Sequence, residues 1–263
     1  MNTRPPLIAS TLLAASLISG AAHAALQGRD LNGSIESFEA YYDTVLDITW
    51  LADANYGAGS SYDDSNRMGG IYTGSATDGR TSWASANAWA ANLSFTNGAN
   101  VYDNWRLPTV EPVNGSTFNY NSSYNGSTDY GYNVSEQGTA FAGSTGSEMA
   151  HLFYDTLNNK GYCPVSTNCS PAGQTGWGLT NKGPFSNLQA NHYWSATEYA
   201  PPSTDFAWSF AMGDGWQFAG YKGYGYSALA VSPGDVAAVP EAETYALMLA
   251  GLGLVGWRAR RRG

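Results

Sequence analysis

Basic side chains are scarce in this chain of 263 residues, which has 12 Lys and Arg against 21 Asp and Glu. Five of the 12 lie in two terminal segments, 1–24 and 237–263. The body between them therefore has seven basic and nineteen acidic residues and a net charge of −12. Nucleic acids and anionic membranes repel so acidic a protein. The composition argues against nucleic-acid binding, and it makes calcium, cationic surfaces or neutral sugars easier partners.

Cysteine and histidine are also rare. The chain has two cysteines, Cys163 and Cys169, and only His151 and His192 remain once residues 1–24 are set aside. A metal site would need more ligands than lie near the cysteines, so a local disulfide is the expected outcome in an exported chain. Two histidines also leave few members for a His-based nucleophilic triad. We therefore predict neither catalytic residues nor a metal site.

The N-terminus has the pattern of a secretory signal peptide. Arg4 precedes an apolar run over 7–18, and Ala22-His23-Ala24 offers small residues at the positions that a signal peptidase recognises. A first transmembrane anchor is the alternative, but the run is short and the cleavage site is good. We predict a signal peptide over 1–24 and a mature chain that begins at Ala25.

The C-terminal segment 237–263 combines a short motif, an apolar run and a basic end. The run extends over about thirteen residues, 245–257, whereas a membrane helix usually needs roughly 20. Its aromatic ends and the arginines that follow nevertheless favour a short transmembrane helix with the arginines in the cytoplasm. A buried core helix is the alternative, against which the terminal position counts. The motif residues are Val239, Pro240, Glu241 and Thr244, and the membrane-stop residues are Arg258, Arg260, Arg261 and Arg262.

Over 239–263 this order of elements resembles the PEP-CTERM sorting signal of Gram-negative bacteria, with Ala242 where that family has a second proline. The resemblance implies that an exosortase, a processing enzyme of the inner membrane, acts on the tail. The protein is then expected to cross the inner membrane and to be held there transiently by its C-terminus. Its destination would be the cell surface or the extracellular space.

Between the two ends, apolar periodicity predicts an α+β body over 25–236. A strand with one buried face is expected at 44–51, where apolar and polar residues alternate. Helices are expected at 83–93, capped by Thr81 or Ser82, and at 147–158, where Thr145 and Glu148 fit a capping box. The region 113–135 is predicted to be a long exposed loop, ordered mainly through its tyrosines. The last third is predicted to be β, with strands at 193–199, 206–212, 216–218 and 226–232.

The body resembles the Lcl C-terminal domain family of bacterial surface proteins over most of 40–236. The similar segments are 47–51, 105–111, 147–154, 193–198, 207–208 and 230–235. Ser232 stands where that family often has Arg. The resemblance implies a C-type lectin-like fold, with two helices around a small, irregular antiparallel sheet and long loops. It also implies adhesion, biofilm formation or binding of extracellular polysaccharide.

Two groups of side chains are candidate metal ligands. Glu148, His151 and Asp155 would share one face of the second helix, for which a solvated face is the simpler explanation. Asp103-Asn104 and Glu111-Pro112 resemble calcium-binding loops of lectin-like domains. A structural ion pair between Arg106 and Glu111 is the simpler explanation there.

Two functions of different classes remain. The first is a non-catalytic exported domain that binds polysaccharide or other surface components, and the second is a secreted glycan hydrolase. Ser195 near His192 and Glu198 is better explained by packing, and no spacing singles out a pair of catalytic carboxylates. Exposed aromatic residues on 113–135 would favour the first function. A cleft with two facing carboxylates, one with a raised pKa, would favour the second.

Overall fold

The computed structural model describes residues 25–34, 37–63, 77–166, 168–169, 172–200 and 203–236. No helix within these ranges is long and apolar enough to cross a membrane. The predicted signal peptide at 1–24 and the predicted membrane helix at 245–257 lie outside them. The described body combines helices with antiparallel sheets, so the α+β class is confirmed.

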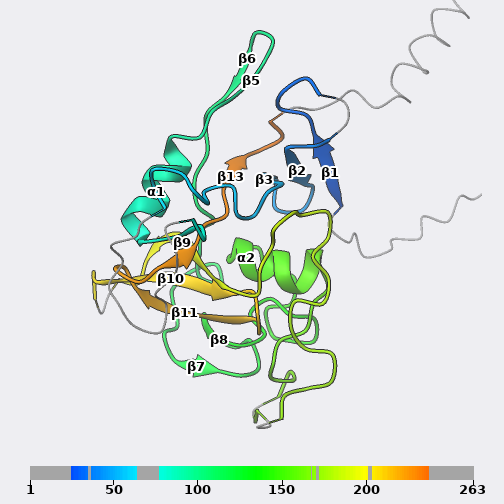
Figure 1. Cartoon of the computed structure of the whole chain (residues 1–263). Helices are drawn as coiled ribbons and strands as arrows, with labels where there is room; N and C mark the ends of the chain where they lie inside the picture. Colours follow the sequence, from blue (N-terminus) through cyan, green and yellow to red (C-terminus); the bar gives the residue numbers. More distant parts are fainter. Residues whose placement is uncertain are drawn as a thin grey trace, which may run out of the picture.

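A four-stranded sheet joins the two ends of the body (Figure 1). Its strands are antiparallel and follow the order β1 (Leu26–Arg29), β2 (Ala40–Asp43), β3 (Ile48–Leu51) and β13 (Val231–Pro233). Arg29 pairs with Asp235, with Nε 2.6 Å from Oδ1 and Nη2 2.8 Å from Oδ2, which fastens β1 to the chain after β13. The predicted one-sided burial of 44–51 is wrong, because all four residues of β3 are buried.

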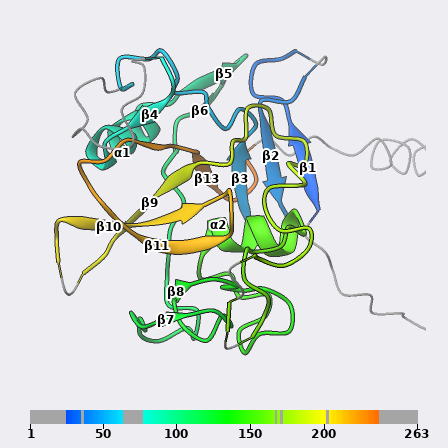
Figure 2. The same ribbon diagram turned by 60° about the horizontal axis from the view of Figure 1, so that its bottom comes forward.

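A second sheet of seven strands forms the other half (Figure 2). Four of its six strand pairs are antiparallel and two are parallel. A tight turn at Gly213-Asp214-Gly215 joins the strands 206–211 and 216–221, as predicted. The strand order is β4 (Arg80–Thr81), β12 (Tyr226–Ser227), β9 (His192–Glu198), β10 (Phe206–Ala211), β11 (Trp216–Tyr221), β8 (Tyr130–Gly131) and β7 (Ser122–Ser123). A separate hairpin, β5 (Phe95–Asn97) with β6 (Asn100–Tyr102), projects from the body.

Both predicted helices are present. Helix α1 (Trp83–Ala91) begins at Ser82, whose side chain accepts a hydrogen bond from Ser85 N. The second begins as α2 (Glu148–His151) and continues as a π-helical segment, η1 (Leu152–Thr156). Its cap is Ser147, which accepts from Ala150 N, so the predicted capping box of Thr145 and Glu148 is wrong.

The core has two parts. One lies between the two sheets and is filled by α2 and η1, whose Met149, Leu152 and Phe153 pack against β3 and β10 residues such as Trp50 and Phe210. The other lies under α1, where Trp89 and its neighbours pack with residues of β9, β12 and the 105–107 segment. Strands β1, β2 and β3 come from the start of the body and β13 comes from its end. Because they share a sheet, residues far apart in the sequence fix the fold. The 113–135 region contributes β7 and β8 to the edge of the second sheet, and Val113 and Val134 to the core.

Candidate ligand-binding surface

One carboxylate organises the start of the 113–135 region. Asp129 is fully buried, and its oxygens accept hydrogen bonds from Val113 N at 2.7 Å and Asn119 N at 2.6 Å. Burial raises the pKa of Asp129, whereas these hydrogen bonds act in the opposite direction. Its backbone carbonyl accepts from Gln217 Nε2 at 2.7 Å, and Gln217 in turn accepts from Ser147 Oγ. The region is thereby bound to β11 and to the start of α2.

Aromatic rings then pack the region onto β10. The indole of Trp208 is fully buried. Phe118 and Tyr120 stack on it at centroid distances of 5.5 and 6.1 Å, and Tyr199 meets it edge-on at 4.8 Å. Tyr120 therefore helps to order this region together with Phe118 and Asp129, and the main role predicted for the tyrosines stays a prediction. The prediction that the region is exposed is wrong for 128–135, because all but Tyr130 of these residues are buried.

A second set of rings continues from this layer to the surface, and we call it the aromatic patch. The ring of Tyr132 is its centre, with centroid distances of 5.3 Å to Trp216, 6.2 Å to Tyr124 and 6.3 Å to Tyr162. Trp177 lies 4.9 Å from Tyr162 in a T-shaped contact. Tyr124 and Trp177 are each 41% exposed, so rings at two ends of the patch face solvent. The patch consists of Tyr124, Tyr132, Tyr162, Trp177 and Trp216.

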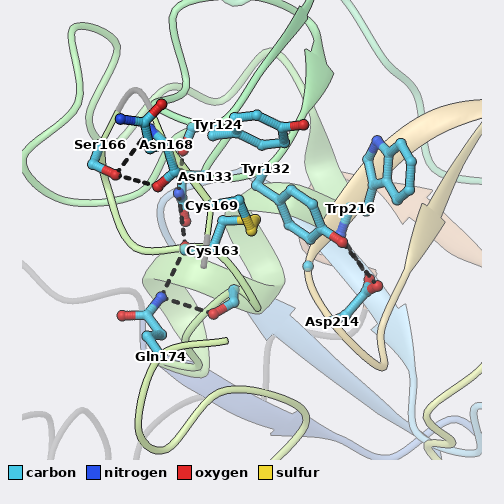
Figure 3. Close-up of a disulfide and its surroundings, with 12 residues drawn as sticks. Tyr124, Tyr132, Asn133, Cys163, Ser166, Asn168, Cys169, Gln174, Asp214 and Trp216 are labelled. Carbon is cyan, nitrogen blue, oxygen red and sulfur yellow. Dashed lines mark hydrogen bonds between the residues drawn. A yellow bond between two sulfur atoms is a disulfide. The ribbon is translucent and has the colours of Figure 1, made fainter. Parts of the chain in front are cut away.

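An acidic group lies directly beside these rings (Figure 3). Tyr132 donates its hydroxyl hydrogen bond to Asp214 Oδ2 at 3.2 Å, and Trp216 N donates to Asp214 Oδ1 at 3.1 Å. Burial, and then the Asp214 charge, raise the pKa of the Tyr132 hydroxyl, which therefore stays protonated and donating at neutral pH. The turn between β10 and β11 thus supplies the Asp214 carboxylate, and the first residue of β11 supplies the Trp216 ring.

The predicted disulfide is confirmed, and it holds the loop that carries Tyr162 and Trp177. Cys163 and Cys169 are bonded, with Cα atoms 4.9 Å apart. The carbonyl of Cys163 accepts from Asn133 Nδ2 at 3.0 Å and from Gln174 Nε2 at 2.9 Å (Figure 3). These bonds join the loop to the residue that follows Tyr132. The disulfide therefore supports one side of the patch.

We expect the double variant Cys163→Ala/Cys169→Ala to lose about 2 kcal/mol of unfolding free energy, because a short closed loop restricts the unfolded chain only modestly. Near-ultraviolet circular dichroism should change with it, since Tyr162 and Trp177 lose their support. Urea unfolding with both optical probes measures the two effects. Labelling of the native, unreduced protein should find no free thiol; two labelled cysteines would contradict the disulfide.

The candidate metal ligands are occupied by other contacts. Glu148 accepts two hydrogen bonds from Arg106, at 2.7 and 2.8 Å, and one from Thr109 N at 2.7 Å. Arg106 therefore pairs with Glu148, and the predicted pair with Glu111 is wrong. His151 Nδ1 lies 3.5 Å from Asp155 Oδ2. The predicted solvated face is also wrong, because Glu148 and His151 are buried against the rest of the body.

Within the described residues, no group of three or more His, Cys, Asp or Glu could hold a metal ion. The two parts of the candidate calcium site are separate. Asp103 follows β6 at the base of the projecting hairpin, whereas Glu111 lines a polar groove of about 490 Å³ between 111–115 and 141–146. Calcium binding stays a hypothesis from the sequence.

One pair of carboxylates resembles the arrangement expected of a hydrolase. Burial and then the charge of Asp155 raise the pKa of Glu136 to about 7. Glu136 Oε2 is buried and has no hydrogen-bond partner among the described residues. Neither Glu136 nor Asp155 lines the cavities beside His192, Glu111 and Trp89. Of the two features expected of a hydrolase, the raised pKa is therefore the one that this pair provides.

Glu136 should make the unfolding free energy depend on pH. Its folded pKa of about 7 exceeds its ordinary value of 4.5, so the folded state binds the proton more tightly. Stability therefore falls as pH rises from about 4.5 to about 7, by on the order of 2 kcal/mol after allowance for solvent screening. Urea unfolding of the variant Glu136→Gln at pH 5 and pH 8 should not show this fall in unfolding free energy. The exposed Glu111→Gln is the control, and equal pH dependence in all three proteins would contradict the assignment.

Ser195 and His192 do not form a nucleophilic site. They lie three residues apart on β9, which points their side chains to opposite faces. Ser195 is buried, and its Oγ accepts from Thr197 N at 3.0 Å. His192 instead lines a cavity of about 200 Å³ with Arg80 and Tyr226, where burial and then the Arg80 charge lower its pKa.

The aromatic patch is the part of the site that sequence reasoning missed. Its rings come from three separate segments, and no local pattern connects Tyr124 and Tyr132 with Trp177 or Trp216. The tyrosine content of 113–135 was the available signal. It indicated aromatic contacts without indicating their partners.

A comparison with protein families matches residues 238–262 to the PEP-CTERM protein-sorting motif. Searches of the curated proteins and of the solved structures found no match. The motif indicates an exported protein that an exosortase, a membrane enzyme, processes and sorts to the cell surface or the extracellular space. The match spans predicted sorting residues that lie outside the described ranges: Val239, Pro240, Glu241, Thr244, Arg258, Arg260, Arg261 and Arg262.

Proposed function

We propose that the body of this exosortase-sorted protein is a non-catalytic, lectin-like domain that binds extracellular polysaccharide at the aromatic patch. Such a protein would act in adhesion or in the matrix of a biofilm. The proposal rests on one observation above all. An exported chain has a contiguous set of rings around the buried Tyr132, and the rings at its two ends, Tyr124 and Trp177, are each 41% exposed.

The chemistry of the patch suits a sugar. A pyranose ring has an apolar face of C–H groups, which can pack on Tyr and Trp rings, and a rim of hydroxyls that needs polar partners. Asp214 provides an acceptor beside Tyr132 and Trp216, and the amide of Gln174 lies next to the disulfide loop. Large rings with two side-chain torsions also lose little conformational entropy when they bind.

The lectin-like assignment of the fold belongs to the same proposal. Two helices, short antiparallel strands and long ordered loops support it, as does the pairing of the body's two ends in one sheet. We propose that binding needs neither calcium nor another cofactor. The alternative, a secreted hydrolase, finds partial support in the raised pKa of Glu136, although one oxygen of that carboxyl, Oε2, is buried.

A glycan array probed with the exported protein tests the proposal. We expect binding to a subset of polysaccharides, unchanged when a chelator removes calcium, because the patch supplies its contacts through rings and one carboxylate. Mass spectrometry of the bound glycans after long incubation should find them intact. Chain shortening would favour the hydrolase, and loss of binding in chelator would show that calcium is required.

A further inference from the structure

The aromatic patch has a charge character as well as an apolar one. The Asp214 carboxylate lies within hydrogen-bonding distance of the Tyr132 hydroxyl and the Trp216 backbone. Lys160, two positions before Tyr162, is exposed, and its carbonyl accepts a hydrogen bond from Gly178 N beside Trp177, so one ammonium group belongs to this side of the patch. The body as a whole has seven basic and nineteen acidic residues. With this net charge of −12, the body attracts cationic ligands over long range, and Asp214 provides a carboxylate at the patch itself.

The rings themselves prefer a cation. The face of a Tyr or Trp ring is negative and attracts ammonium groups, and the attraction is stronger where water is excluded. Two cation–π contacts occur within the described residues, Arg29 over Tyr42 and Lys222 over Trp83. Neither uses Tyr124, Tyr132, Trp177 or Trp216. Among the described residues, Tyr124 and Trp177 therefore have exposed ring surface that neither of these two contacts uses.

We propose that the ligand class of the patch is a cationic amino-sugar polymer, in which each sugar ring has an apolar face and a free ammonium group. This inference rests on the proposed function and narrows it. The sugar rings would stack on Trp177 and Tyr124, and an ammonium group would lie near Asp214. Acidic polysaccharides, such as those built from uronic acids, would be repelled by the same carboxylate and by the net charge of the body.

Isothermal titration of the exported protein at pH 6 with three hexasaccharides tests the inference. The probes are β-1,4-linked glucosamine, its N-acetylated form and an oligogalacturonate. We expect the glucosamine hexamer to bind about tenfold more tightly than the N-acetylated one and the galacturonate to bind most weakly. Added salt should reduce the preference, because part of it is Coulombic.

Two variants identify the groups responsible. Asp214→Asn keeps an acceptor for Trp216 N but removes the charge, so it should abolish most of the preference for the charged hexamer. Asp103→Asn, which makes the same change near the projecting hairpin, should keep it. Trp177→Ala should weaken binding of both amino-sugar hexamers. Circular dichroism and melting curves confirm that each variant is folded.

The outcomes separate this inference from the function on which it rests. Equal or tighter binding of the N-acetylated or acidic hexamer would overturn the cationic preference and leave polysaccharide binding intact. If the preference for the charged hexamer survives in Asp214→Asn, it arises from the overall charge of the body, and the role of the patch is overturned. Binding of none of the three, together with an empty glycan array, would overturn both proposals.

Discussion

Glu241→Ala should leave an uncleaved precursor held in the inner membrane. The substitution removes the acidic residue of the matched sorting motif but keeps the apolar run and the arginines that hold the chain in the bilayer. Cell fractionation followed by mass measurement should find the full C-terminus in the membrane fraction. The unaltered protein should appear outside the cell with its tail processed.

Changing all four terminal arginines to Glu should have a different result. The apolar run is short, so its orientation depends on basic residues that stay in the cytoplasm. Four acids at those positions should let the body escape unprocessed into the periplasm or fail to orient. A matched Arg→Lys set keeps the charge and should sort normally. Should the Glu241 and arginine variants both reach the exterior with the mass and yield of the unaltered protein, the tail would not be a sorting signal.

Trp208→Ala should destabilise the body by roughly 3–5 kcal/mol, the range for loss of a large buried aromatic side chain. Its indole is fully buried and is the platform on which Phe118, Tyr120 and Tyr199 pack. The truncation therefore removes core volume and the support of the region that carries Tyr124. Trp177→Ala, at a 41% exposed position, should cost less than about 1 kcal/mol.

Urea unfolding followed by far-ultraviolet circular dichroism gives both free energies. Near-ultraviolet spectra should change more for Trp208→Ala, because several neighbouring rings lose their packing. A Trp208→Ala protein within 1 kcal/mol of the unaltered one would show that this aromatic layer is not part of the core.

Local signals predicted part of the fold correctly. The Ser82 cap and apolar spacing were sufficient to predict α1, and the Gly-Asp-Gly turn was sufficient to predict the pairing of β10 with β11. The disulfide followed from two nearby cysteines in an exported chain. Each of these features depends on residues within about a dozen positions of one another, where spacing alone fixes the geometry.

Long-range contacts explain the predictions that failed. Glu148 was assigned to a solvated face, but Arg106 lies 42 positions earlier and brings it into the interior. The 113–135 region has few aliphatic residues, yet it packs on Trp208 through its rings and is held by Asp129, and nine of its 23 residues are buried. The alternation of apolar and polar residues over 44–51 places Thr49 on the polar face of the strand. Its hydroxyl instead donates to Gly234 O, 185 positions later. Neither periodicity nor propensity identifies partners at such separations.

Co-sedimentation with extracellular polysaccharide from the producing cells tests the central claim most directly. The three proteins to compare are the unaltered chain, the double variant Tyr124→Ala/Trp177→Ala and the control Tyr56→Ala, whose ring is 49% exposed but lies outside the patch. Patch binding predicts that the unaltered chain and the control sediment with the polymer, while the folded double variant stays in solution. Equal sedimentation of all three, or of none, would contradict polysaccharide binding at the aromatic patch.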